Sequence, residues 1–311
     1  MDNKISFLLS KLLIIRSKLK GKYIQYKFKN YPNKKNPISS RITSYPYISG
    51  DTFLSIADCL IINNEDKPLI TKSERNQNII FIELDMFSKK WVFNYAKNFK
   101  KVILHNGDQC PSIKLLKELK KRKIHVFAAN INYQDKYINP IPQGIENAHH
   151  KKNGDLEYYN PISLSKNYEP KKNILLASFS VREYKLNPSS TEVRKKYVKL
   201  LEKFNYKNDF FLNLKDYRKN LYESYFVICP PGNNGFDCHR NWEALYHKTI
   251  PVIEEKYYLF SHLDLPILVV KTLEEFLNYS DQKKLEIYYN IINKTFEKIY
   301  AQWWINYINS K

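Results

Sequence analysis

Two separate stretches of the chain alternate short β-branched runs with helical patterns, and this alternation limits the fold more than any other feature. In the first stretch we expect a strand, a helix, a strand, a helix and a strand at residues 79–84, 88–99, 102–105, 112–123 and 124–128. Strands joined by about ten to fifteen residues of amphipathic helix form a parallel sheet with right-handed crossovers. This stretch therefore predicts one α/β unit.

The second stretch begins after a polar segment in which the periodicity is lost. Residues 149–172 contain the turn-forming pairs Asn153-Gly154 and Asn160-Pro161, a composition typical of a linker. Beyond this segment we expect strands at residues 173–179, 209–214, 225–229 and 249–253, and helices at 190–204, 216–223 and 237–247. This order predicts a second α/β unit.

The length of the chain agrees with two units, since 311 residues exceed the usual size of one core. The predicted fold class is α/β, with two Rossmann-like domains. We expect an N-terminal domain at residues 1–150, a linker at 151–172, a second domain at 173–281 and a helical tail at 282–311. Ligands of such sheets bind at the loops that follow the carboxyl ends of the strands, so function is expected there.

The net charge of +20 comes from 51 Lys and Arg against 31 Asp and Glu, and a field of this size attracts phosphate-rich partners and anionic surfaces. The lysines are nevertheless scattered among abundant Asn, Ile and Tyr, which the codon usage of an AT-rich genome would produce by itself. We therefore expect no nucleic-acid partner. A nonenzymatic nucleic-acid-binding protein is kept as the alternative from another class, and it requires basic and aromatic residues gathered on one sheet face.

Residues 5–20 are too short and too charged to span a bilayer, and no small-residue cleavage site follows them. Drawn as a helix, residues 4–20 place Leu8, Leu12 and Ile15 near one face and lysines nearer the other. This helix could rest on an anionic membrane surface or pack on the domain. The four cysteines form no CxxC pair and have no histidine at zinc spacing, so we expect a cytoplasmic protein that could be peripheral on the inner face of a membrane.

The strongest candidate site lies at residues 229–245, where a hydrophobic strand enters a glycine-containing loop that opens a helix. Glycine is rare in this chain, seven residues in all, and its value is to let a backbone turn or approach a ligand closely. The amide groups and positive dipole end at a helix start suit an anion. The expected ligand-binding residues of this segment are Gly232, Asn233, Gly235, Asp237, Arg240 and Glu243.

Two of these residues have defined expected roles. Arg240 would clamp a phosphate with two hydrogen bonds, and Glu243, three residues further along the same helix face, would accept both hydroxyls of a ribose. The alternative is a simple capped helix, with Asp237 as the N-cap and Arg240 and Glu243 as a surface ion pair.

The run PPGNNGFDCHRNWEALYHKTIPVI at residues 230–253 resembles the donor-site signature of exostosin-like glycosyltransferases. Four upstream segments resemble a bacterial and viral branch of that family: YPYISGDTF at 45–53, LHNGD at 104–108, FAANI at 127–131 and PIPQGIEN at 140–147. The resemblance implies a GT-B fold. In that fold an N-terminal acceptor domain faces a C-terminal nucleotide-sugar domain across a cleft, and a final helix crosses back to the first domain.

The function implied by the resemblance is that of a hexosyl- or pentosyltransferase. Such an enzyme would move a sugar from a UDP-, GDP- or CMP-linked donor to a hydroxyl of a lipid-linked acceptor or of a cell-surface glycan, in polysaccharide or lipopolysaccharide biosynthesis. A phospho-alditol or phosphoryl transferase that uses the same pyrophosphate site is the nearest alternative. No Asp-x-Asp motif is present, so we expect that a metal is not required and that no cofactor is tightly bound.

The remaining expected roles concern the phosphate that leaves the donor and the acceptor hydroxyl that attacks the sugar. Arg194 is carried over from the resemblance as a second phosphate ligand. The acceptor hydroxyl needs a base, and the candidates are Asp108, Asp51 and His105, of which we rank Asp108 first. Each has a structural alternative, because Asp51 and Asp108 could cap the helices that follow them and His105 could be a hydrogen-bond partner. A single carboxylate base favours inversion of the anomeric centre.

Overall fold

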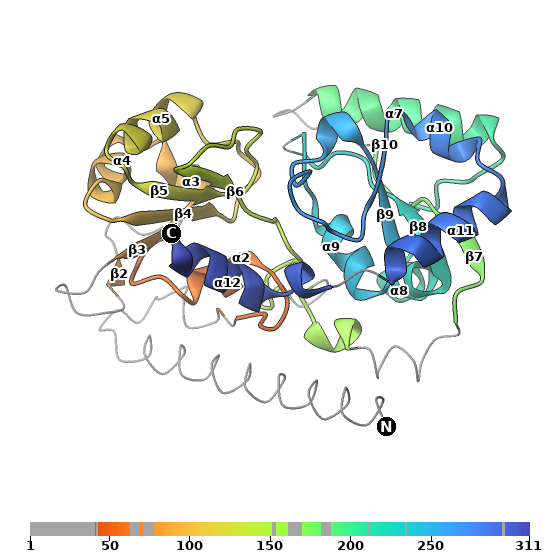
Figure 1. Cartoon of the computed structure of the whole chain (residues 1–311), viewed down its shortest axis with the longest axis horizontal. Coiled ribbons are helices and arrows are strands. Elements are labelled where there is room, and N and C mark those ends of the chain that lie inside the picture. The colour runs from red at the N-terminus through yellow and green to blue at the C-terminus, as the bar shows by residue number, and fades with distance from the viewer. Residues whose placement is uncertain are drawn as a thin grey trace. The chain divides into compact units, whose positions relative to one another are not determined.

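The computed structural model describes residues 41, 43–62, 69–70, 78–150, 154–160, 170–181, 188–210, 212–233, 235–293 and 296–311. It divides into two compact units (Figure 1). Unit 1 comprises the described residues up to Gly154 together with Tyr300–Lys311, and unit 2 comprises Asp155–Ile299. The segment 4–20, for which we expect a membrane-facing helix, lies outside the described residues.

Unit 1 is built on a six-stranded sheet. In spatial order its strands are β2 (Leu69–Ile70), β1 (Cys59–Ile61), β3 (Ile79–Glu83), β4 (Lys101–His105), β5 (His125–Ala128) and β6 (Ile138–Pro140). Only β2 runs antiparallel to its neighbour, and the other five strands are parallel. Every residue of β3 is buried, as expected for a parallel strand covered on both faces.

Helices cover both faces of this sheet. Figure 1 shows α4 (Lys90–Ala96) and α5 (Ile113–Lys121) on one side, and α2 (Gly50–Leu54) and α12 (Ala301–Ser310) on the other. The short helix α3 (Leu84–Phe87) continues directly from β3. The alternation of side chains along β5 matches the two layers, because Val126 and Ala128 join the core with α4 and α5 while Phe127 meets Tyr307 of α12 edge to face.

Unit 2 contains a four-stranded parallel sheet. Its strands, in spatial order, are β10 (Leu268–Val270), β9 (Ile250–Glu254), β8 (Ser224–Ile228) and β7 (Asn173–Leu176). The helices α7 (Pro188–Lys203), α10 (Leu273–Leu277) and α11 (Asp281–Ile292) form one buried cluster with a face of this sheet. Helix α8 (Leu214–Glu223) packs on β7 and β8, and α9 (His239–Tyr246) packs on β9. Three short 3-10 helices are η3 (Leu156–Tyr159), η4 (Glu255–Tyr257) and η5 (Glu297–Ile299).

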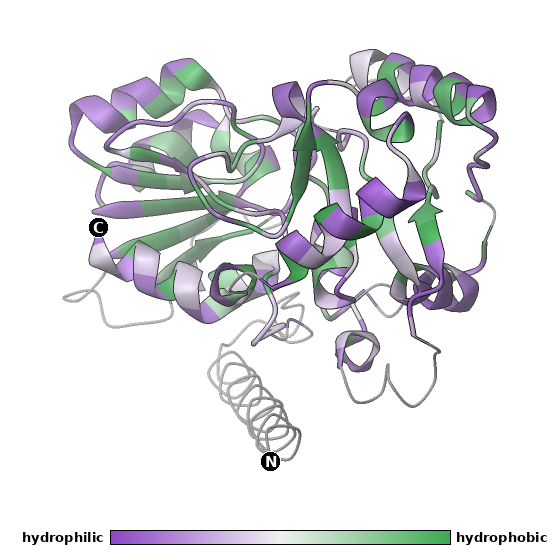
Figure 2. Cartoon of the chain, turned by 45° about the vertical axis from the view of Figure 1, so that its right-hand side comes forward, coloured by the Kyte–Doolittle hydropathy of each residue, from purple (hydrophilic) through white to green (hydrophobic). Residues whose placement is uncertain are grey.

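The hydropathy pattern follows these layers. In Figure 2 the strands of both sheets are mostly green, whereas the outward sides of the helices are purple. The predicted α/β class with parallel sheets is confirmed by the strand pairing, in which only β2 of the described strands is antiparallel. No helix within the described ranges is long and apolar enough to cross a bilayer.

Two expected elements differ from the structure. The strand expected at 209–214 is wrong: the described residues there form a loop, in which Asp209 N donates to Ala177 O and Asn213 caps the start of α8. The tail expected as one helix contains two, because α11 ends at Ile292 with Asn293 as its C-cap and α12 starts at Ala301. The sequence analysis also missed β1, β2, β6 and β10, which are two or three residues long.

Lys171 joins the amino ends of two strands in unit 2. Its Nζ donates to Tyr222 O at 2.8 Å, to Ser224 O at 2.7 Å and to Thr249 Oγ1 at 2.9 Å. These acceptors are neutral, so burial dominates and lowers the pKa of Lys171 to about 7, with a smaller contribution from the charge of Lys248. The folded state thus disfavours the ammonium form relative to the unfolded chain.

This lowered pKa predicts how stability depends on pH. Between about pH 7 and the ordinary lysine value near 10.4, the unfolded chain binds this proton and the folded protein does not. Stability should therefore rise with pH in that window, by up to about 1.4 kcal/mol per pH unit. Chemical denaturation at pH 7, 8 and 9 would show a steeper rise in the wild type than in Lys171→Met. Equal slopes in the two proteins would contradict this origin of the effect.

Candidate functional site

The loop between β8 and α9 closes on itself through its two glycines. Gly232 N donates to Phe236 O at 2.8 Å, and Gly235 N donates to Gly232 O at 2.9 Å. Gly235 has φ of 93°, a conformation that favours glycine. The two glycine amides are thus used inside the loop, and hydrogen bonds to an anion would have to come from neighbouring groups.

Asp237 ties this loop to the start of α9. Its Oδ1 accepts from Cys238 N at 2.9 Å and from Asn241 Nδ2 at 2.7 Å, and its Oδ2 accepts from Trp242 Nε1 at 2.8 Å. The residue is 6% exposed. Cys238 occupies the N-cap position, so the alternative of Asp237 as N-cap is wrong; its carboxylate instead fixes the geometry of the helix start.

Two arginines meet at the loop. Arg194, on α7, donates from Nε and Nη2 to Pro231 O at 3.2 and 2.8 Å, and its Nη2 lies 3.5 Å from Asn233 Oδ1. Arg240, in the first turn of α9, has a buried Nε with no hydrogen-bond partner in the described part of the chain. Burial, and then the charge of Arg240, lowers the pKa of Arg194.

The two arginines have different charged surroundings. The hydrogen-bond acceptors of Arg194 are all neutral oxygens, and neither arginine forms an ion pair with any described residue. Burial alone would lower the pKa of Arg240, but surrounding groups that include Glu243 outweigh burial and raise it. Arg194 has no such carboxylate beside it, and its pKa is lowered, so an anion at the loop would stabilise its charge.

Glu243 lies one turn beyond Arg240 on α9 and is 8% exposed. Its Oε2 accepts from Tyr217 Oη on α8 at 2.9 Å. Burial, and then the charge of Glu243, raises the pKa of Tyr217, so the phenol stays a donor. The alternative of a surface ion pair between Arg240 and Glu243 is wrong, because Glu243 is buried and pairs with tyrosine.

Unit 1 places its candidate residues at the carboxyl edge of its sheet. His105 ends β4 and is 1% exposed. Its Nε2 donates to Pro142 O at 2.9 Å, and its Nδ1 accepts from Asn106 N at 2.7 Å. Gly50 is required beside it, since a Cβ there would lie 1.6 Å from Asn106 Oδ1. Both ring nitrogens of His105 are thus engaged in holding neighbouring loops.

Asp51 is the centre of a charged cluster at the same edge. The residue is 1% exposed and lies in the first turn of α2, whose N-cap is Ser49. Oδ1 accepts from Arg41 Nη1 at 2.8 Å, and Oδ2 lies 3.1 Å from His149 Nδ1. Arg41 also donates from Nη2 to Glu83 Oε1 at 2.6 Å, at the end of β3.

Asp108, the first-ranked base, is exposed in the loop after β4. Asn106 and Gly107 precede it with positive φ values of 56° and 153°. Asn130 Nδ2 donates to Gly107 O at 2.9 Å and holds this loop. Helix α5 takes Ser112 as its N-cap, so Asp108 is not the cap of that helix.

The partners of these candidates were not predicted from the sequence. Their contacts span between 10 and 98 positions of the chain, and no helical or strand period links the two members of a pair: Arg41, Glu83, Tyr217 and His149. The contact of an arginine or histidine with a buried carboxylate can be recognised only in the folded structure, where the sheet brings the ends of separate strands together.

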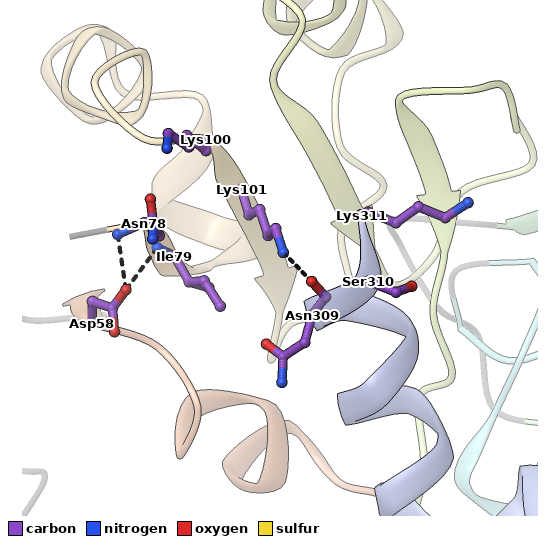
Figure 3. A pocket seen from close by; sticks show the side chains of 8 residues that line it. All are labelled: Asp58, Asn78, Ile79, Lys100, Lys101, Asn309, Ser310 and Lys311. Carbon is purple, nitrogen blue, oxygen red and sulfur yellow. Dashed lines mark hydrogen bonds between the residues drawn. The ribbon is translucent and has the colours of Figure 1, made fainter. Parts of the chain in front are cut away.

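A cavity of about 510 Å³ lies at the opposite, amino edge of the unit 1 sheet (Figure 3). In it Lys101 Nζ donates to Ile308 O at 2.8 Å and to Asn309 O at 2.9 Å, which caps the C-terminal end of α12. Asp58 Oδ2 accepts from Asn78 N and Ile79 N. These contacts join structural elements, and none of the expected ligand-binding residues lines this cavity.

No three His, Cys, Asp or Glu side chains within the described ranges come together to hold a metal ion. The chain matches no protein-family model, and no curated protein matches it.

Proposed function

We propose that this protein is a glycosyltransferase whose nucleotide-sugar donor binds unit 2 with its pyrophosphate at Arg194 and Arg240. The observation that carries the proposal is the pair of guanidinium groups at a loop that opens a helix, where Arg240 Nε is buried without a hydrogen-bond partner in the described part of the chain. A pyrophosphate supplies the missing charge and the acceptor for Arg240 Nε. The donor would be UDP-, GDP- or CMP-linked.

The geometry suits the leaving group of sugar transfer. Negative charge grows on the nucleoside diphosphate as the anomeric carbon becomes oxocarbenium-like, and a pre-placed arginine stabilises that charge. Glu243 would accept hydroxyls of the ribose through Oε1, while Tyr217 holds its other oxygen. Because Tyr217 fixes this carboxylate, the ribose would meet an acceptor that is already oriented.

The acceptor side of the proposal falls to unit 1. We propose a GT-B fold, in which unit 1 binds the glycan or lipid-linked acceptor whose hydroxyl receives the sugar. A peripheral position on a membrane belongs to the same proposal. Transfer of a phospho-alditol or phosphoryl group would use the same arginine pair, and identification of the product distinguishes it from sugar transfer.

Thermal stabilisation by a panel of nucleoside diphosphates and sugar nucleotides tests the proposal. A ligand at 100 times its dissociation constant stabilises the folded protein by about 2.7 kcal/mol. We expect a shift with one nucleoside diphosphate in the wild type, and its loss in Arg240→Ala and in Glu243→Ala. Lys196→Ala, which removes an exposed charge from α7, is the matched control and should keep the shift.

The contrary result is equally specific. If no nucleotide stabilises the wild type and the protein instead binds nucleic acid tightly in a salt-dependent manner, the glycosyltransferase proposal is wrong and the nucleic-acid-binding alternative takes its place.

A further inference from the structure

The contact between Asp51 and His149 has the geometry of a base held by a carboxylate. His149 Nδ1 lies 3.1 Å from Asp51 Oδ2. A carboxylate that also accepts from Arg41 can only accept, so the imidazole proton is on Nδ1. The other nitrogen, Nε2, then carries a lone pair. The ring contacts of His149 within the described ranges are the one from Nδ1 to Asp51 and the stacking on His150.

A base must be reachable by its substrate, whereas the carboxylate that holds the base in place can be buried. The Asp51 side chain is 1% exposed, whereas that of His149 is 21% exposed. Asp51 and His105 are too buried to touch a substrate, and both nitrogens of His105 are engaged. Within this cluster, His149 is the titratable group that can meet a ligand.

Charged groups on separate elements surround the pair. Arg41 brings one positive charge, and Asp51 and Glu83 bring two negative charges. The cluster therefore carries one net negative charge while His149 is neutral. A proton that Nε2 receives from an acceptor hydroxyl would bring the net charge of the cluster to zero.

The position in the fold agrees with a ligand site. Glu83 ends β3 and His105 ends β4, and Asn147, which accepts from Asp51 N at 2.7 Å, belongs to the loop that follows β6. Asn147 Nδ2 donates in turn to Asn106 Oδ1 at 3.1 Å. The cluster thus lies at the carboxyl edge of a parallel sheet, where α/β proteins bind their ligands, and hydrogen bonds fix it to three strands.

We propose that His149 is the general base that activates the acceptor hydroxyl, and that Asp51 is its positioning residue. The inference rests on the glycosyltransferase proposal. Nε2 takes the proton of the acceptor hydroxyl while its oxygen forms a bond to the anomeric carbon. The bond from that carbon to the nucleoside diphosphate breaks, and its electron pair goes to the departing phosphate oxygen.

Two neighbours compete for the role. His150 stacks on His149 with ring centroids 4.0 Å apart, and burial, followed by the charge of His149, lowers its pKa. It makes no contact with Asp51 comparable to that of His149. Asp108 is an exposed carboxylate at the same sheet edge, and it is the base that the sequence analysis ranks first. Variants of both residues are therefore the informative comparisons.

The experiment measures release of nucleoside diphosphate from the sugar nucleotide that stabilises the wild type most, with water and with glycerol as acceptors. We expect His149→Gln to lower the rate by about 10²–10⁴-fold and to leave thermal stabilisation by the same donor unchanged. Asp51→Asn should lower the rate as well, while His150→Gln should not. His149 is partly exposed, so its replacement is expected to leave the melting temperature within a few degrees of the wild type.

A wild-type rate in His149→Gln overturns the proposal, and so does a loss of rate that follows Asp108→Asn instead. Donor binding separates this failure from failure of the glycosyltransferase proposal, in which no sugar nucleotide stabilises the wild type. The ring tautomer provides a readout that needs neither donor nor turnover. A long-range ¹H–¹⁵N spectrum of the histidine-labelled protein should show the His149 proton on Nδ1, and a proton on Nε2 would overturn the proposal.

Discussion

Arg240→Met should change the stability of the ligand-free protein by less than about 1 kcal/mol and weaken its binding of a nucleoside diphosphate by about ten- to a hundredfold. The loss corresponds to hydrogen bonds from a charged donor, worth about 1.5–3 kcal/mol. The stability should change little, because losing the unpartnered buried Nε and the repulsion of Arg194 offsets losing the attraction of Glu243. Methionine removes both penalties and keeps much of the apolar stem.

Isothermal titration and chemical denaturation on the same samples measure the two effects. Lys196→Met is the matched control, since it removes an exposed lysine from α7 and should change neither quantity. Arg194→Met is a useful contrast, because Arg194 also holds Pro231 O and its loss should lower stability as well as affinity. A stability loss of more than about 1 kcal/mol in Arg240→Met would show that the arginine is structural.

Arg41→Met should destabilise the protein by about 3 kcal/mol. Arg41 bridges Asp51 and Glu83, whose side chains are 1% and 8% exposed, and its removal leaves two buried carboxylates together. Breaking a buried ion pair from one side costs about 3–5 kcal/mol. We expect the lower part of this range, because the Arg41 side chain is 15% exposed and is partly screened by solvent.

Chemical denaturation that follows the unfolding of unit 1 measures this effect. Arg122→Met removes an exposed arginine from the same unit and is the charge-matched control. The pKa of Arg41 is raised: burial alone would lower it, and the charges of Asp51 and Glu83 outweigh burial. A loss below about 1 kcal/mol would mean that the two carboxylates find other partners when Arg41 is absent.

The periodicity of the sequence was enough to predict most of the parallel strands and the helices between them. Five of the predicted strands are rich in apolar and β-branched residues, a composition that indicates burial on both faces: β3, β4, β5, β8 and β9. The strands that were not predicted are two or three residues long, which is too short for a hydrophobic period to be recognised. At 209–214 the apolar residues resemble a strand, but the backbone of Asp209 pairs with a loop residue, and tertiary contacts decided the conformation.

The candidate site was predictable only where its chemistry is local. Gly235, Arg240 and Glu243 share one loop and helix, so their spacing carries information. Asp237 accepts hydrogen bonds from the side chains of Trp242 and Asn241, and the positions of these residues in the sequence do not by themselves predict those bonds. The partners of Asp51 are separated from it by 10 and 98 positions, and only the meeting of strand ends explains why they converge.

The assignment of α12 to unit 1 has a consequence for the order in which the protein is made. Trp304 and Ile308 of this helix are buried in unit 1, yet the whole of unit 2 precedes them in the chain. During synthesis on the ribosome, unit 2 is complete before the last helix of unit 1 has emerged. The sheet face around Phe127 therefore stays uncovered until α12 has been synthesised, and a nascent chain paused before residue 301 exposes an apolar surface that a chaperone would bind.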